Sequence, residues 1–131
     1  MAPYRILTVD DDEAIRFLVR ENLKLGGYEV TEAADGREAL RMIAAAQPDL
    51  IILDVKMPEP DGWEVLRILR GHPDTEALPV IMLTVLADDA NIARGWGIGA
   101  DFYLTKPFEP QELMEVVDRL LRGEEAPASH P

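Results

Sequence analysis

Residues 48–66 read PDLIILDVKMPEPDGWEVL, and the pattern of this stretch decides the fold. The apolar run at 50–53 shows no polar alternation, which is typical of a strand buried on both faces of a parallel sheet. Asp54 follows the run directly, and a proline-rich loop then leads through Asp61 and Gly62 into a helical pattern. The stretch therefore predicts a strand, a carboxylate at the strand's end and a returning helix.

The same alternation of strand and helix patterns continues in both directions along the chain. The predicted strands are Arg5–Val9, Tyr28–Glu32, Asp49–Leu53, Pro79–Leu83 and Asp101–Leu104. The predicted helices are Glu13 to Leu25, about Gly36 to Ala46, the stretch from Asp61 to Gly71, one from about Asp88, and Glu109 to Leu121. Five alternations predict an α/β fold: a doubly wound, five-stranded parallel sheet with helices on both faces.

Composition excludes several classes of protein. A chain of 131 residues suits one domain, and the absence of cysteine excludes disulfides and thiolate metal sites. The net charge of −12 argues against direct nucleic-acid binding by this domain, because phosphate contacts need clustered lysine and arginine. No apolar run approaches the roughly 20 residues of a membrane span, and no signal peptide is visible. We expect a cytoplasmic protein with a domain at 1–122 and a flexible tail or linker stub at 123–131.

Polar residues follow the predicted strands, and parallel strands bring such residues to one edge of the sheet, where open α/β folds bind ligands. These residues are Asp10, Asp11 and Asp12 after the first strand, Asp54 after the third, Thr84 after the fourth, and Thr105 and Lys106 after the fifth. Neighbouring carboxylates repel one another unless a cation lies among them, and oxygen ligands at an open edge suit Mg²⁺.

A carboxylate beside Mg²⁺ and facing a lysine can accept a phosphoryl group as a nucleophile, while the two cations neutralise charge on the phosphoryl oxygens. Each residue alone has a simpler interpretation. Asp12 suits a helix N-cap, Thr84 an ordinary strand position and Lys106 a solvated surface. Their joint placement favours a site.

The motifs together resemble those of the receiver domain of two-component response regulators, of the chemotaxis-regulator type, over about residues 4–122. They are VDDDEAIR (9–16), EAADGREAL (32–40), PDLIILDVKMPEPDGWEVL (48–66), LPVIMLT (78–84) and GADFYLTKPF (99–108). The resemblance implies a flavodoxin-like fold with strand order 2-1-3-4-5.

The resemblance also implies a role for each residue that matches a motif. For phosphoryl transfer it implies Asp54 as phosphoacceptor, Asp11 as direct Mg²⁺ ligand, Asp10 as its partner, directly or through water, and the backbone carbonyl of Lys56 as a further ligand. For switching it implies Thr84 as the hydroxyl, Lys106 as the phosphoryl-binding lysine, Tyr103 as the aromatic, and a cis bond before Pro107. Mn²⁺ is expected to substitute for Mg²⁺.

Two features depart from the family pattern. Val85 and Leu86 follow Thr84, where a small residue is usual, and Lys56 places a second cation near the site. We expect this crowding to slow both hydrolysis of the acyl phosphate and phosphorylation by small donors. Glycines 95, 97 and 99 predict a fourth helix that is short, irregular or mobile, although Gly97 and Gly99 equally suit a C-cap and turn.

The expected function is a two-state switch rather than a turnover enzyme. A histidine kinase or phosphotransfer protein would phosphorylate Asp54, Tyr103 would shift inward, and the face of the fourth helix, fifth strand and fifth helix would change. That face would bind a downstream protein, a fused output domain or a second copy of the domain, and no membrane. Two alternatives are a phosphorylation-independent interaction module and an acid-nucleophile phosphatase. The phosphatase would need an aspartate where Lys56 stands.

Overall fold

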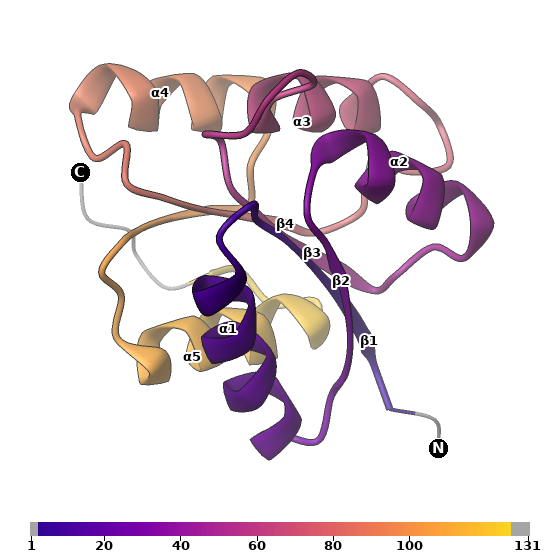
Figure 1. Ribbon diagram of the computed structural model, residues 1–131, viewed down its shortest axis with the longest axis vertical. Helices are drawn as coiled ribbons and strands as arrows, with labels where there is room; N and C mark the ends of the chain where they lie inside the picture. The colour runs from indigo at the N-terminus through magenta and orange to yellow at the C-terminus, as the bar shows by residue number, and fades with distance from the viewer. Residues whose placement is uncertain (1–2, 127–131) are drawn as a thin grey trace.

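One five-stranded parallel sheet forms the centre of the protein. The structure is a computed structural model that describes residues 3–126. The strands lie in the order β2-β1-β3-β4-β5, and every neighbouring pair is parallel (Figure 1). Their bounds are β1 Arg5–Val9, β2 Glu29–Ala33, β3 Leu50–Leu53, β4 Val80–Thr84 and β5 Phe102–Thr105. The predicted fold class and strand order are confirmed.

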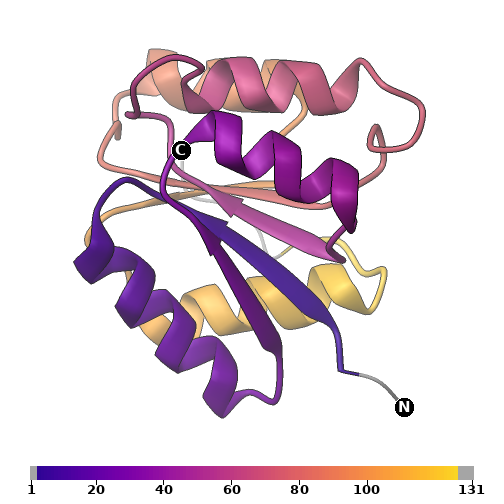
Figure 2. The same ribbon diagram turned by 45° about the vertical axis from the view of Figure 1, so that its right-hand side comes forward.

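Helices cover both faces of this sheet, as Figures 1 and 2 show. On one face lie α1 (Glu13–Leu25) and α5 (Pro110–Leu121). The other face carries α2 (Gly36–Ala45), α3 (Gly62–Arg70) and α4 (Asp89–Ile98). Because the sheet is covered twice, the protein has two apolar layers instead of one.

The central strand β3 explains why its sequence lacks alternation. Its four side chains are all buried, but successive residues enter opposite layers. Leu50 and Ile52 pack with α1 and α5, whereas Ile51 and Leu53 pack under α2 and α3. A side-chain period of two with both faces covered requires apolar residues at every position.

Several predicted strand boundaries differ from the observed ones by one residue, and β2 is an example with a clear cause. The strand expected at 28–32 lies at Glu29–Ala33. Tyr28 does not belong to the strand, because its N–H donates to the carbonyl of Leu23 and closes the end of α1. Gly27, just before it, has a φ of 88°. This backbone group therefore belongs to the helix cap and does not pair within the sheet.

Helix α4 corrects one expectation. It is a regular ten-residue helix, longer than α3, so the prediction of a short or irregular helix is wrong. Gly99 forms the C-cap with a φ of 115°, as the alternative interpretation required, whereas Gly97 lies inside the helix. Mobility of α4 stays a prediction.

The C-terminal segment leaves the last helix close to the predicted domain end. α5 ends at Leu121, and the half-buried Ala126 packs against the layer formed with α1 and α5. Residues 127–131 of the predicted tail lie outside the described residues, and the domain boundary stays a prediction. None of the helices within residues 3–126 is long and apolar enough to cross a membrane.

Candidate phosphoacceptor site

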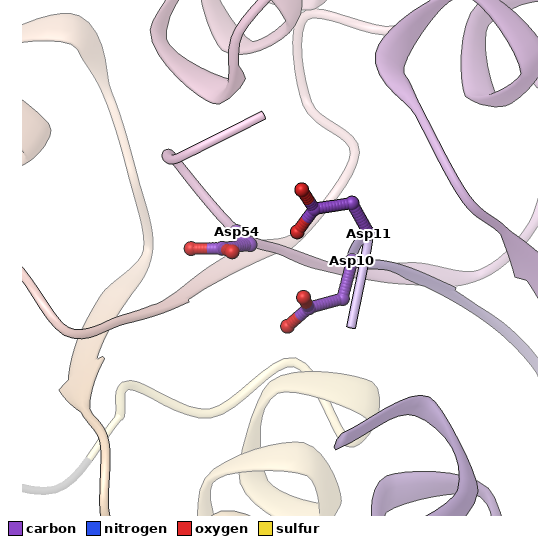
Figure 3. Close-up of side chains that lie close together, drawn as sticks. All are labelled: Asp10, Asp11 and Asp54. Carbon is purple, nitrogen blue, oxygen red and sulfur yellow. The ribbon is translucent and has the colours of Figure 1, made fainter. Parts of the chain in front are cut away.

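Three carboxylates meet at the carboxyl edge of the sheet. Figure 3 shows Asp10 and Asp11 from the end of β1 beside Asp54 from the end of β3. One oxygen from each lies within 4.8 Å of the others. Asp10 and Asp54 are 2% and 5% exposed, whereas Asp11 is exposed to solvent. The sequence prediction that these residues gather is confirmed.

Backbone hydrogen bonds fix the two buried carboxylates in place. The N–H of Asp10 donates to Ala33 at 3.2 Å, and the N–H of Asp54 donates to Val9 at 3.0 Å. Both residues thus continue the sheet ladder by one step beyond their strands. Asp12 accepts from the N–H of Ala14 at 2.9 Å and caps α1, so its simpler interpretation as an N-cap is correct.

Gly62 allows the next helix to begin directly against this edge. A Cβ at Gly62 would collide with the backbone carbonyl of Asp54, and the Gly62 N–H donates to Val55 at 3.0 Å. Asp61 then caps α3 by accepting from the N–H of Glu64 at 2.9 Å. The loop after Asp54 is therefore folded tightly back onto the site.

Lys106 joins the two buried carboxylates. Its Nζ donates to Asp10 Oδ2 at 2.7 Å and to Asp54 Oδ2 at 3.5 Å. Its backbone N–H donates to the Thr84 carbonyl at 2.8 Å, and the bond to Pro107 is cis, as the resemblance implied. A second cis bond, Glu59–Pro60, was not foreseen from the sequence.

The charges of this cluster are partly balanced. Burial raises the pKa of Asp10 above its ordinary value, and the hydrogen bond from Lys106 offsets only part of that rise. Burial acts to lower the pKa of Lys106, but the hydrogen bond to Asp10 and the charge of Asp54 outweigh it, so that pKa is raised. One lysine among three carboxylates leaves a net negative site.

The donor set fits a hard divalent cation. All three candidate ligands are carboxylates at the edge of the sheet, and Asp11 is exposed to solvent. This suits Mg²⁺, which binds through one or two carboxylates and keeps several waters. The Lys56 N–H donates to Asp54 Oδ1 at 3.3 Å, which places the Lys56 backbone beside the cluster. The roles of the Lys56 carbonyl and of each carboxylate stay predictions.

The other predicted residues lie around the cluster at different depths. Thr84 is fully buried, and its Oγ1 accepts from the Leu86 N–H at 3.4 Å. Val85 is 53% exposed, whereas Leu86 packs partly against the core under α3 and α4. The Lys56 side chain is exposed. Of the three residues expected to crowd the site, Leu86 packs against the core, whereas Val85 and Lys56 are exposed.

Tyr103 already points inward. It is 6% exposed, its hydroxyl donates to the Leu86 carbonyl at 2.6 Å, and burial raises its pKa to about 12. Its ring stacks on Trp63 with centroids 6.3 Å apart, and the Arg94 guanidinium lies 4.9 Å from the Trp63 ring centroid. The sequence analysis missed Trp63 and Arg94, although an aromatic at the start of a helix beside the site was a visible signal.

Arg16 is a further contact that sequence reasoning missed. Its Nη1 donates to the backbone carbonyl of Asp10 at 2.6 Å, and its Nε donates to Glu32 at 3.3 Å. The first turns of α1 are thus tied to the strand end that carries Asp10. The spacing of VDDDEAIR contained this arginine, but periodicity alone does not reveal a contact to a backbone carbonyl.

Comparison with known proteins identifies the family. The model of the response regulator receiver domain matches residues 6–118. The chain belongs to this family. Response regulator MprA of Mycolicibacterium vanbaalenii is 48% identical over 120 residues, which cover 92% of this chain and 51% of MprA. The DNA-binding dual master transcriptional regulator RpaA of Synechocystis is 45% identical over 118 residues, covering 90% and 49%.

Solved structures agree with this assignment to the receiver domains. A response regulator from Chloroflexus aurantiacus has a TM-score of 0.89 at 42% identity and covers 92% of this chain and 99% of its own. Chemotaxis protein CheY4 of Vibrio cholerae has a TM-score of 0.84 at 39% identity, with 90% and 98% covered. The chain spans about half the length of the curated relatives it matches. The flavodoxin-like receiver domain of two-component systems is thus its architecture.

Proposed function

We propose that this receiver domain is a phosphoacceptor switch in which Asp54 accepts a phosphoryl group from the phosphohistidine of a histidine kinase or phosphotransfer protein in the cytoplasm. The observation that carries the proposal is the position of Lys106, which contacts both Asp10 and Asp54 while Asp11 completes the cluster. A buried carboxylate that faces a lysine and two further carboxylates has the parts of a metal-assisted nucleophile.

In the proposed reaction, an Asp54 oxygen attacks phosphorus as the bond between phosphorus and the donor's imidazole nitrogen breaks. An acyl phosphate forms on Asp54, and the electron pair of the broken bond stays with the imidazole. Lys106 neutralises charge on the transferred oxygens, and the Thr84 hydroxyl donates a hydrogen bond to one of them. Bound Mg²⁺, or Mn²⁺ in its place, supplies further positive charge. Asp10, Asp11, Asp54 and the Lys56 carbonyl would hold it.

The phosphorylated state is proposed to alter the face formed by α4, β5 and α5. Partners for this face include a downstream protein, a fused output domain or a second receiver domain. Relatives named as transcriptional regulators are about twice as long as the matched region, which favours a fused output domain in a longer protein. The domain assists its own phosphorylation and dephosphorylation and is not a turnover enzyme in this proposal.

Intact-mass measurement tests the proposal directly. Incubation with acetyl phosphate and Mg²⁺ should add the mass of one phosphoryl group, and chelation of the metal should prevent it. Asp54→Asn should remove the adduct, whereas Asp74→Asn, a change at an exposed aspartate of the α3–β4 loop, should retain it. An adduct that persists in Asp54→Asn would contradict Asp54 as the acceptor. No adduct with acetyl phosphate or with any kinase donor would favour the phosphorylation-independent module.

We also propose that Lys56, Val85 and Leu86 tune the lifetime of the acyl phosphate. Val85 is half exposed beside Thr84, so its side chain is free to restrict the approach of water. Val85→Ala should therefore accelerate dephosphorylation. The rate is measured as the loss of the mass adduct with time after the donor is removed. An unchanged rate in Val85→Ala would contradict the proposed crowding.

A further inference from the structure

The inward position of Tyr103 has support from three separate elements. Its hydroxyl is held by the Leu86 carbonyl in the β4–α4 loop. Its ring stacks on Trp63 from the first turn of α3, with an angle of 22° between the planes. Gly95 of α4 supplies the third contact. No phosphoryl group is required for any of them.

The Trp63 contact is built into the core and is not a chance surface approach. Trp63 is 4% exposed and belongs to the same apolar layer as Tyr103. Arg94 lies over the Trp63 ring and so ties α4 to α3 at the same point. Stacked aromatic pairs and cation–π contacts both add stabilisation beyond the burial of area.

Gly95 brings α4 close enough to enclose the Tyr103 ring. A Cβ at this position would lie 2.8 Å from Tyr103 Cδ2 and 3.5 Å from Trp63 Cζ3. The first distance is shorter than a real carbon contact, so any side chain here would displace the ring or the helix. Trp63 and Gly95 thus enclose the ring in its inward position from two sides.

We propose that Trp63 is a positioning residue that holds Tyr103 inward before phosphoryl transfer, so that phosphorylation does not move this ring. The consequence for signalling rests on the function proposed above, but the position of the ring does not. If the ring is already in place, the free-energy difference between the two states must come from other contacts, chiefly those of Thr84 and Lys106 with the phosphoryl oxygens.

Fluorine NMR of protein labelled with 3-fluorotyrosine measures the ring position. The chain has three tyrosines, and the signal missing from Tyr103→Phe assigns the one of interest. A soluble paramagnetic chelate broadens exposed rings, so the Tyr103 signal should be shielded in unmodified protein. It should remain shielded and keep its position after acetyl phosphate and Mg²⁺ have produced the mass adduct.

Two variants extend the test. Trp63→Leu removes the stacked partner and should shift the ratio of inward to outward ring by about two- to tenfold, seen as increased broadening. In this variant, phosphorylation should restore shielding of Tyr103, which a purely structural role for Trp63 does not predict. Trp96→Leu is the matched control, since Trp96 is partly exposed on α4 and contacts Phe102 instead of Tyr103.

The outcomes separate this inference from the proposed function. A Tyr103 signal that is exposed in unmodified wild type, or that moves to a shielded position on phosphorylation, overturns the inference even though the adduct has formed. If no adduct forms, the switch proposal fails, while shielding that depends on Trp63 in unmodified protein still supports the inference. Equal broadening in Trp63→Leu and Trp96→Leu also contradicts it.

Discussion

Gly95 and Gly97 lie only two residues apart in α4, but replacing each with alanine should change the stability of the protein in opposite directions. A Cβ at Gly97 would meet no heavy atom within 4 Å, and the residue has helical backbone. Alanine is favoured over glycine inside helices by about 1 kcal/mol, and less near a helix end. Gly97→Ala should therefore raise the free energy of unfolding by about 0.5–1 kcal/mol.

Gly95→Ala gains the same helix propensity but meets a buried ring. Its Cβ would lie 2.8 Å from Tyr103 Cδ2, and that ring cannot withdraw because Trp63 stacks against it. Overpacking of a buried site costs about 1–3 kcal/mol, so this variant should be less stable than Gly97→Ala by about that amount. For a chain of this size the difference corresponds to a Tm separation of roughly 3–5 °C per kcal/mol.

Urea unfolding followed by circular dichroism measures both variants against wild type. The m-value should stay constant, because neither change alters the surface exposed on unfolding. The double variant should be additive within about 0.5 kcal/mol, since the two Cβ positions have no shared contact. If Gly95→Ala is as stabilising as Gly97→Ala, the close packing of α4 on Tyr103 is refuted.

Three further changes test the charge and hydrogen-bond networks. Burial raises the pKa of Asp10, so the folded state favours the protonated Asp10 carboxyl group. The stability that this preference contributes is fully present below the ordinary pKa of 3.8 and is lost as pH rises through the raised pKa. Asp10→Asn should therefore be more stable than wild type in metal-free urea unfolding near neutral pH, and should lose stabilisation by Mg²⁺. Arg70→Met removes donors to the carbonyls of Gly99 and Leu78 and to Asp101, and should cost about 2–4 kcal/mol in the same assay, against almost nothing for the exposed Arg67→Met. The raised pKa of Tyr103 predicts a contribution to stability that is fully present below pH 10 and is lost as pH rises toward 12. Unfolding measured across this pH range should show a smaller decline in Tyr103→Phe than in wild type.

The sequence was sufficient where local pattern and topology determine the answer. The run at 50–53 predicted a doubly covered strand because every position is apolar, and the structure buries all four side chains. Asp10, Asp11 and Asp54 were predicted to meet because parallel strands share a carboxyl edge, and their oxygens do meet. Neither inference needed knowledge of side-chain packing.

The missed contacts depend on how one element packs against another. The stack of Trp63 on Tyr103 joins residues from α3 and β5, and the Arg16 hydrogen bond reaches a backbone carbonyl of the preceding strand end. The spacing of the glycines suggested that α4 is short or irregular, whereas the absence of a side chain at Gly95 allows α4 to pack closely on the Tyr103 ring. Periodicity reports which face of an element is buried, but not which residue lies against it.

A short chain of contacts links the proposed phosphoryl site to the ring that would not move. Thr84 Oγ1 accepts the Leu86 N–H at 3.4 Å, and the Leu86 carbonyl accepts the Tyr103 hydroxyl at 2.6 Å. The first bond is long and weak, whereas the second is short and partly buried. A Thr84 hydroxyl that turns toward a phosphoryl oxygen would give up the weak bond at little cost. Movement would then begin in the β4–α4 loop at residues 85–88, while Trp63 and Gly95 keep Tyr103 in place as the fixed support against which the loop and the start of α4 shift.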